Sequence, residues 1–374
     1  MLLLILVRWD LEAQLIFFAI LFIGAVSAIF FIAYFSSLLM QKKEDAILEK
    51  RDERESLLLT ILFEENSEKD DLLVGFKEFN IDVKGNGLRK GKRKMLRQIM
   101  IDEILKMKKN LSGAGLEDLY KLYEELRLYK DSYKKLTNNH FQLMVMGIRE
   151  LSEMNHKVYY RSIYRCTNHV QEDVRIEAQL AIVRLFGVKG LRFLSRVTYT
   201  ISEWQQMTLL YLLTNMKNER PVDIERWLDS KNDSVVIFSL RLADKYNCFE
   251  LLEKIGHCLY HPNETVKIQA VLCLKNIYNE NTELELLAYY QVVSKRVQIA
   301  VLEVLKSLAT QDSVFFLYKY LVSCELEIRF SIVRILNGLC EGIDIIRAVE
   351  KEPEIKESVI QMLEQINNEK LQYN

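Results

Sequence analysis

The residues best suited to chemistry lie in the sequence HCLYH, from His257 to His261. Two histidines one helical turn apart, with Cys258 beside the first, are side chains that can bind zinc. A closed zinc site needs further ligands at standard spacing, and the next thiol, Cys248, lies far back along the chain. We therefore interpret these residues as a helix end before a turn at Pro262, and we expect no metal site.

Other catalytic patterns are missing from the sequence. It contains no G-x-S-x-G motif and no cysteine–histidine nucleophile signature. The glycine-containing stretch KGNGLRKGK, residues 84–92, lacks the spacing of a P-loop. The carboxylates are scattered over positions that we expect to face solvent. We therefore expect no catalytic residue, no cofactor and no small-molecule substrate, which means that the chain is not an enzyme.

The histidines belong to a repeating helical pattern. In HPNETVKIQAVLCLKNI, Val266 is followed by apolar residues two, five, eight and eleven positions later. The pattern recurs at steps of 31 residues, with one step of 30, in units that begin at Leu143, Val174, Gln205, Val235, Val266, Val297 and Ile328. A repeat of this length predicts a solenoid in which each unit contacts its neighbours.

Composition agrees with an all-α chain. Its 374 residues include 3 prolines and 13 glycines, and no stretch alternates strictly between apolar and polar residues. The net charge of −1 creates no general attraction for nucleic acid. The six cysteines form no C-x-x-C pair, so we interpret them as reduced core thiols in a reducing compartment.

The start of the first helix in several units resembles the HEAT repeat family. Asp173, Val174, Arg175 and Ala178 match its pattern best, whereas the unit at Gln205 has Trp204 and Gln206 where charges are expected. The resemblance covers about residues 111–374 and implies a HEAT-like α-solenoid of seven helical hairpins after an N-terminal cap. It also implies that Asp173 and Arg175 are structural residues of a ladder between units.

HEAT arrays mostly act as scaffolds, and the fold does not determine a function. HEAT-type metal hydroxylases carry His-Glu pairs, and no histidine here precedes a glutamate. HEAT-like DNA-repair enzymes are another class, but an apolar N-terminal segment and a near-neutral array disfavour them. The chain also looks like bacterial single-pass, membrane-anchored HEAT proteins without a defined activity.

Residues 13–40 carry no charge over 28 positions, which as a helix would extend about 42 Å. This length favours a transmembrane helix over a signal peptide or a buried helix. Lys42, Lys43, Lys50 and Arg51 follow it, which predicts an inner-membrane protein with its C-terminal array in the cytoplasm. The opposite orientation would expose the thiols to oxidants. Gly24, Ser27 and Ala28 are candidates for packing against another membrane helix, or are simply common residues of such helices.

A basic segment follows, with no acidic residue from Val83 to Ile101. Its candidate contacts to an anionic surface are Arg89, Lys90, Lys92, Arg93, Lys94 and Arg97. The segment could rest on anionic lipid, remain solvated, or bind nucleic acid or another polyanion. No aromatic residue interrupts the basic run, which disfavours single-stranded nucleic acid.

The second helices of the units are expected to line the concave face of the array. Their aromatic residues cannot all be core, because Tyr289 adjoins Tyr290 and Phe315 adjoins Phe316. The candidate partner-binding residues are Tyr260, Tyr289, Phe316 and Tyr320.

These observations predict a membrane-anchored HEAT scaffold that binds a protein partner at the cytoplasmic face. The alternative is a non-catalytic accessory subunit of a membrane enzyme complex, such as an envelope glycosyltransferase. The predicted organisation is a tail at 1–12, a transmembrane helix at 13–40, a charged helix and basic segment at 41–110, and the solenoid at 111–374.

Overall fold

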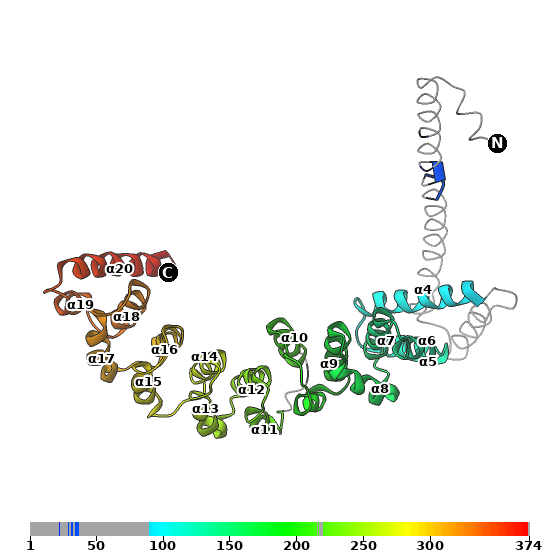
Figure 1. The fold of residues 1–374 in the computed structure, drawn as a ribbon, viewed down its shortest axis with the longest axis horizontal. Helices are drawn as coiled ribbons and strands as arrows, with labels where there is room; N and C mark the ends of the chain where they lie inside the picture. Colours follow the sequence, from blue (N-terminus) through cyan, green and yellow to red (C-terminus); the bar gives the residue numbers. More distant parts are fainter. Residues whose placement is uncertain are drawn as a thin grey trace, which may run out of the picture. The chain divides into compact units, whose positions relative to one another are not determined.

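The computed structural model describes residues 22, 29, 31, 32, 34–36, 90–214, 216 and 220–372. Over this part of the chain the regular structure is helical, and no strand occurs (Figure 1). The chain divides into two compact units, Met1–Ser132 and Tyr133–Asn374. The prediction of an all-α chain is thereby confirmed for the described residues.

The first unit contains α4 (Lys90–Lys108), α5 (Ala114–Glu125) and the start of α6 (Tyr129–Leu136). Helix α5 forms where the sequence has a helical stripe, and Leu119, Leu122 and Tyr123 on that stripe are buried. Helix α4 contributes Met100, Ile101 and Ile104 to the buried residues. The two helices pack against each other.

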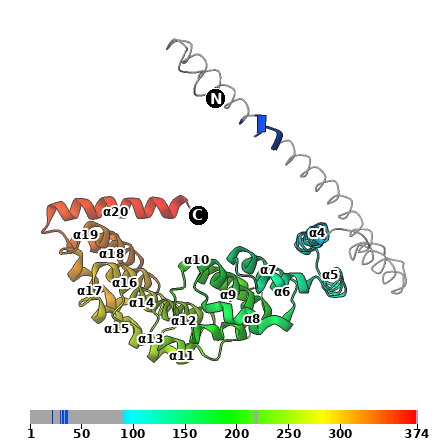
Figure 2. The same ribbon diagram turned by 45° about the vertical axis from the view of Figure 1, so that its right-hand side comes forward.

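The second unit is an array of paired helices, and in each pair a first helix is followed by a second (Figures 1 and 2). The first helices are α7 (Phe141–Glu153), α9 (Glu172–Phe186), α10 (Glu203–Thr214), α12 (Asp233–Lys245), α14 (Glu264–Cys273), α16 (Lys295–Leu308) and α18 (Leu326–Leu339). The second elements are α8 (Tyr160–Arg165), the 3₁₀ helix η3 (Gly187–Ser195), α11 (Ile224–Leu228), α13 (Leu252–Cys258), α15 (Thr282–Tyr290), α17 (Gln311–Leu321) and α19 (Gly342–Ala348). Helix α20 (Pro353–Gln372) ends the array, and short 3₁₀ helices at Lys157–Tyr159, Cys166–Asn168 and Phe249–Leu251 join some elements.

The predicted repeat step agrees with the helix positions. Each residue that begins a unit in the sequence pattern is the third residue of a first helix, as with Val174 in α9 and Val266 in α14. The residue eight positions later is buried in every unit, whereas the residue two positions later is never fully buried. The residue four positions later, as at Ala178 and Ser239, is also buried in all seven units, because it lies on the same face one helical turn along.

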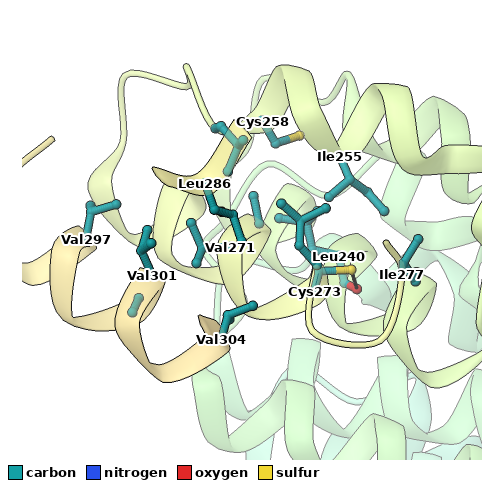
Figure 3. Packing of buried hydrophobic residues seen from close by; sticks show 14 of the residues in the cluster. Leu240, Ile255, Cys258, Val271, Cys273, Ile277, Leu286, Val297, Val301 and Val304 are labelled. Atoms are coloured by element: carbon teal, nitrogen blue, oxygen red, sulfur yellow. Dashed lines mark hydrogen bonds between the residues drawn. The ribbon is translucent and has the colours of Figure 1, made fainter. Parts of the chain in front are cut away.

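The core runs continuously between neighbouring hairpins. Figure 3 shows this core around Cys273, where α14 meets side chains of α12, α13, α15 and α16. Cys273 is fully buried, with Sγ 3.4 Å from the carbonyl oxygen of Leu240. The described cysteines are free thiols, of which Cys166, Cys248, Cys258 and Cys273 are buried. Cys273 therefore acts as a small apolar side chain, as its position in the pattern predicts.

Polar side chains at the start of the first helices join neighbouring units. Asn263 caps α14 by accepting from the Thr265 amide, and its Nδ2 donates to Asp233 of the preceding hairpin at 2.5 Å. Arg175, which the resemblance assigned to a charge ladder, instead donates to the carbonyl oxygens of His169 and Val170 and lies over the Tyr199 ring. It therefore fixes the turn that leads into its own helix.

The first helices, rather than the second helices, line the inner side of the curve within residues 133–374 (Figures 1 and 2). The expectation that the second helices line the concave face is therefore wrong. The aromatic residues on α15 and α17 belong to the outer layer of this unit.

Most of the predicted transmembrane segment, residues 13–40, lies outside the described residues. Its described members are Phe22, Ile29, Phe31, Ile32, Tyr34, Phe35 and Ser36, all helical and exposed. Within the part of the chain that was described, no helix has the length and apolar character needed to cross a membrane. That finding contradicts the predicted single-pass location in the inner membrane, because a span needs about 20 consecutive apolar helical residues. The predicted single-pass location in the inner membrane is therefore wrong.

Candidate protein-binding surface

Helix α10 exposes three large apolar side chains on one face. Trp204, Met207 and Tyr211 follow one another at spacings of three and four residues, so they share that face. Their exposed fractions are 66%, 55% and 68%. Isolated exposed apolar residues are common on protein surfaces, but a row of them along one helix marks an interaction site more often than chance exposure.

The same helix buries polar residues on its opposite side. Gln205 and Gln206 are both buried, at positions where the neighbouring first helices carry apolar or charged residues. The side-chain amide of Gln205 donates to the side-chain oxygen of Gln179 on α9. The Gln206 amide donates to the carbonyl oxygens of Ile201 and Ser234 at 3.1 and 3.3 Å. Helix α10 is therefore partly inverted relative to its neighbours, with amides inside and apolar side chains outside.

A groove of about 550 Å³ adjoins Trp204 on the first-helix side of the array. Its apolar lining comes from three successive first helices, which bring together side chains that are distant in sequence. These side chains are Phe141, Val145, Ile176, Leu180 and Trp204. We call the groove, together with Met207 and Tyr211, the apolar surface.

Paired charges form the rim of the apolar surface. Arg149 Nη2 lies 2.8 Å from Glu177 Oε2, and this hydrogen bond, with the charge of Glu177, raises the pKa of Arg149. Arg184 lies 3.2 Å from Glu153 and 3.7 Å from Glu177. The Arg149 side chain remains more than half exposed, so it can still contact a ligand in the groove. An apolar floor with a polar rim is the usual composition of a protein interface.

The four predicted partner-binding residues do not form one exposed surface. Tyr260 is 76% exposed. Tyr289 is buried beneath it, with the two rings edge to face at 5.8 Å, and its hydroxyl donates to the carbonyl oxygen of Leu259 at 2.5 Å. Phe316 and Tyr320 are half-buried and pack on the buried ring of Tyr290 at 5.7 and 5.2 Å. The structure thus leaves Tyr260 as the accessible member of the set.

Phe315 and the exposed row on α10 were not among the candidate binding residues predicted from the sequence. Phe315, next to the half-buried Phe316, is 83% exposed. Trp204 was noted only as a departure from the repeat pattern. The available signal was the coincidence of Trp204, Met207 and Tyr211 on one helical face beside two glutamines in core positions. The repeat pattern is recognised from apolar residues at core positions. It therefore does not reveal a helix that has glutamines at core positions and apolar residues at exposed positions.

The predicted anionic-surface contacts are only partly described. Arg89, like Gly24, Ser27 and Ala28 of the apolar segment, lies outside the described residues. Lys90, Lys92 and Arg93 lie in α4, and the Lys94 side chain is exposed. Arg97 instead binds within the first unit: its Nε lies 2.5 Å from Asp131, and its Nη2 donates to the carbonyl oxygens of Leu126 and Arg127 at 3.0 Å. Arg97 therefore links α4 to the turn after α5.

The histidine–cysteine group lies at the end of α13, as the sequence predicts. His257 is exposed and Cys258 is buried. His261 Nδ1 accepts a hydrogen bond from the backbone N–H of Asn263 at 3.1 Å. Burial raises the pKa of the Cys258 thiol to about 11, which keeps it protonated at neutral pH. Among the described residues, no three or more His, Cys, Asp or Glu side chains are grouped so that they could hold a metal ion.

Comparisons with known proteins give no family. No protein-family model matches the chain. No curated protein matches it either. Among solved structures, it is similar to the complex of CpcE and CpcF of phycocyanin lyase from Nostoc sp. PCC7120, with 11% identity over 76% of this chain and 96% of that chain and a TM-score of 0.24. It is also similar to a structure of microtubule polymerases with tumor overexpressed gene domain arrays, with 12% identity, 82% and 84% coverage and a TM-score of 0.28. These scores are too low for either likeness to carry an argument.

Proposed function

We propose that the chain is a non-catalytic HEAT-like scaffold that binds a protein partner through its apolar surface. The inversion of α10 is the observation that supports this proposal most directly. A helix that buries Gln205 and Gln206 while exposing Trp204, Met207 and Tyr211 is poorly designed for stability alone. The arrangement becomes favourable when a partner covers the exposed face.

Burial by a partner would recover a substantial free energy. Full burial of a large apolar side chain is worth about 1.5–3 kcal/mol. Tryptophan, methionine, tyrosine and arginine are the types enriched at the centre of protein interfaces, and the apolar surface contains all four. Trp204 is the central anchor, because it belongs to both the exposed row on α10 and the groove.

The shape of the groove favours a helical partner segment. The groove lies across the successive first helices α7, α9 and α10. Each of these helices contributes at least one apolar side chain to its lining. An amphipathic helix also presents apolar side chains seven residues apart, which is about 10.5 Å along its axis and close to the 8–10 Å between packed helices. The rim charges of Arg149 and Asp173 would then meet the polar edges of that helix.

The chemistry of the thiols supports a binding function rather than a nucleophilic one. Burial raises the pKa of Cys166, Cys248, Cys258 and Cys273, so these thiols resist conversion to the reactive thiolate. The alternative role as an accessory subunit of a membrane enzyme complex depended on the apolar segment and gains no support from the described residues.

The test compares two sets of surface substitutions in the full chain. The first combines Trp204→Ala, Met207→Ala and Tyr211→Ala, and the control combines Val292→Ala and Phe315→Ala, which remove exposed apolar side chains elsewhere. Both proteins should keep a Tm close to wild type, because these side chains are mostly exposed. We expect cross-linking and affinity purification from the native cells to recover the same partner with wild type and control, and to lose it with the α10 variant. Recovery of that partner at the wild-type level with the α10 variant would exclude this surface.

A further inference from the structure

A second groove lies among the second elements of residues 133–374, and half of its lining residues are arginines. Its volume is about 470 Å³, within the range of about 300–1,000 Å³ that ligand sites in proteins usually have. The lining consists of Tyr164 of α8, Arg192 and Ser195 of η3, Arg196 directly after η3, Asp223 directly before α11 and Arg226 of α11.

A buried tryptophan holds the two arginine-bearing elements together. The Trp227 indole, on α11, is 2% exposed, and its Nε1 donates to Ser195 Oγ of η3 at 2.9 Å. Arg226 directly precedes Trp227, and Arg196 directly follows Ser195. Arg192 lies three residues before Ser195, and residues three apart share one face of a 3₁₀ helix. The fold therefore gathers the three arginines near the Ser195 hydroxyl, where they line one groove.

The Ser195 hydroxyl has a proton left to donate. An indole N–H is only a donor, so Ser195 Oγ is the acceptor in the hydrogen bond with Trp227. Within the described part of the chain, Ser195 Oγ donates to no other group. Its proton is therefore available to an anion in the groove.

The three arginines of the groove are exposed and have no anionic partner in the described protein. Among the residues that the structure describes, the guanidinium groups of Arg192, Arg196 and Arg226 make no hydrogen bond, and no carboxylate lies within 4.0 Å of them. Asp223 lines the groove at a longer distance. One carboxylate against three guanidinium groups leaves two positive charges, which a ligand with two negative charges would neutralise.

The other carboxylates on and beside α11 are held by a lysine. Lys254 Nζ lies 2.6 Å from Asp229 and 3.5 Å from Glu225. Both carboxylates therefore have a cationic partner already, and they lower the positive charge of the groove less than free carboxylates would.

A phosphate monoester matches these groups better than a carboxylate does. It carries a charge of about −1.5 to −2 at pH 7 and has three oxygens that accept hydrogen bonds. A guanidinium presents paired N–H groups that match two such oxygens, and clusters of arginines are a usual means of binding phosphorylated ligands. A carboxylate or a phosphodiester carries one charge, so either would leave positive charge in the groove.

We propose that this groove binds a phosphate monoester. Arg192, Arg196 and Arg226 contact its oxygens through their guanidinium groups, and Ser195 donates to it through its hydroxyl. The site goes beyond the apolar surface and does not depend on it, because no residue lines both grooves. Trp204→Ala should therefore leave the binding of phosphate esters unchanged, and the two proposals can fail separately.

The test follows the ³¹P NMR signal of methyl phosphate during titration with the full chain at about pH 8, where this ester is a dianion. Dimethyl phosphate, which carries one negative charge, is the matched probe. We expect methyl phosphate to bind at least roughly tenfold more tightly, because its second charge adds to the attraction for the arginines. Equal affinity for the two esters, or a methyl phosphate signal that the protein does not change, would overturn the proposal.

Variants locate the binding. Arg192→Gln combined with Arg226→Gln should weaken methyl phosphate binding at least roughly tenfold, because two charge-assisted contacts are lost. The Tm should stay close to wild type, since neither guanidinium group bonds to another part of the described protein. Lys275→Gln combined with Lys351→Gln removes two exposed cations elsewhere and should leave the affinity unchanged. Unaltered affinity in the arginine variant, or an equal loss in the lysine variant, would overturn the proposal.

A phosphoserine peptide identifies the source of the phosphate group. This probe carries one phosphoserine between glycines, and its affinity is compared with that of methyl phosphate in the same titration. Tighter binding of the peptide would support the site and assign it to a phosphorylated side chain of a protein. Equal binding would support the site and assign it to a small phosphate ester.

Discussion

Arg241 on α12 lies 2.7 Å from Glu203 on α10, measured between Nη2 and Oε1. The same guanidinium donates to Gln206 on α10 at 3.2 Å and to Gln269 on α14 at 3.0 Å, so it joins three successive first helices. Helices α10 and α12 approach each other less closely than the other successive first helices, and a polar groove of about 1100 Å³ opens beside them. Polar contacts therefore replace part of the apolar packing at this junction.

Replacement of Arg241 should weaken the junction. Arg241→Met leaves the buried Gln206 carbonyl without this donor and is expected to lower the free energy of unfolding by about 1–3 kcal/mol. Glu203→Gln should cost less than about 1 kcal/mol, since the Glu203 side chain is mostly exposed. Denaturant titration and amide hydrogen exchange of α10 measure both effects. Equal stability of the two variants would show that Arg241 does not stabilise the contact between α10 and α12.

The buried ion pair between α6 and α7 should show strong coupling. Lys135 Nζ lies 2.5 Å from Glu150 Oε1, and both side chains are buried. Lys135→Met removes the ammonium group that pairs with the buried Glu150 carboxylate and should destabilise the protein by about 3–5 kcal/mol. Adding Glu150→Gln should restore part of that loss, because the buried charge is then removed. A double-mutant cycle checks this, and additive effects would contradict the expectation.

Gly190 allows η3 to approach α9 closely. A Cβ at Gly190 would lie 2.5 Å from the Ile182 carbonyl oxygen and 2.9 Å from the Val183 Cα, both backbone atoms. Gly190→Ala should therefore cost about 1–3 kcal/mol. Gly256→Ala is the matched control, because a Cβ in α13 would meet nothing within 4 Å, and it should be neutral or stabilising by up to about 1 kcal/mol. Thermal unfolding of both variants distinguishes these effects.

Stability should fall at alkaline pH in part through Cys258. Burial and the nearby charge of Asp229 raise its pKa from 9.0 to about 11, so the unfolded chain loses this proton first. The stabilisation is fully present below pH 9 and is lost as the pH rises to 11, to an extent of roughly 2–3 kcal/mol. Cys258→Ala should reduce the slope of unfolding free energy against pH in this interval. An unchanged slope would show that the thiol does not contribute.

The repeat step could be read from the sequence because burial imposes it directly. Val235, Val266 and Val297 recur at fixed intervals, since each must fill the same place between two hairpins. The apolar character of this position therefore located the first helices. The second elements were harder to locate, because η3 is a 3₁₀ helix and α11 has only five residues, too short for a clear periodic stripe.

The candidate surfaces could not be read in the same way. Exposure of Trp204 depends on which side of α10 the amides of Gln205 and Gln206 occupy, and their partners Gln179 and Ser234 lie in other units. The apolar surface arises from stacking of the units.

Site-specific photo-cross-linking tests the proposed scaffold most directly. A photoreactive phenylalanine analogue at Met207 in the full chain, activated in the native cells, should give a defined cross-link to one protein. The same analogue at Val292, an exposed residue outside the apolar surface, should not give it, and Trp204→Ala should abolish it at Met207. If Met207 and Val292 yield the same products, or if Trp204→Ala leaves the Met207 product intact, the apolar surface is not the binding site.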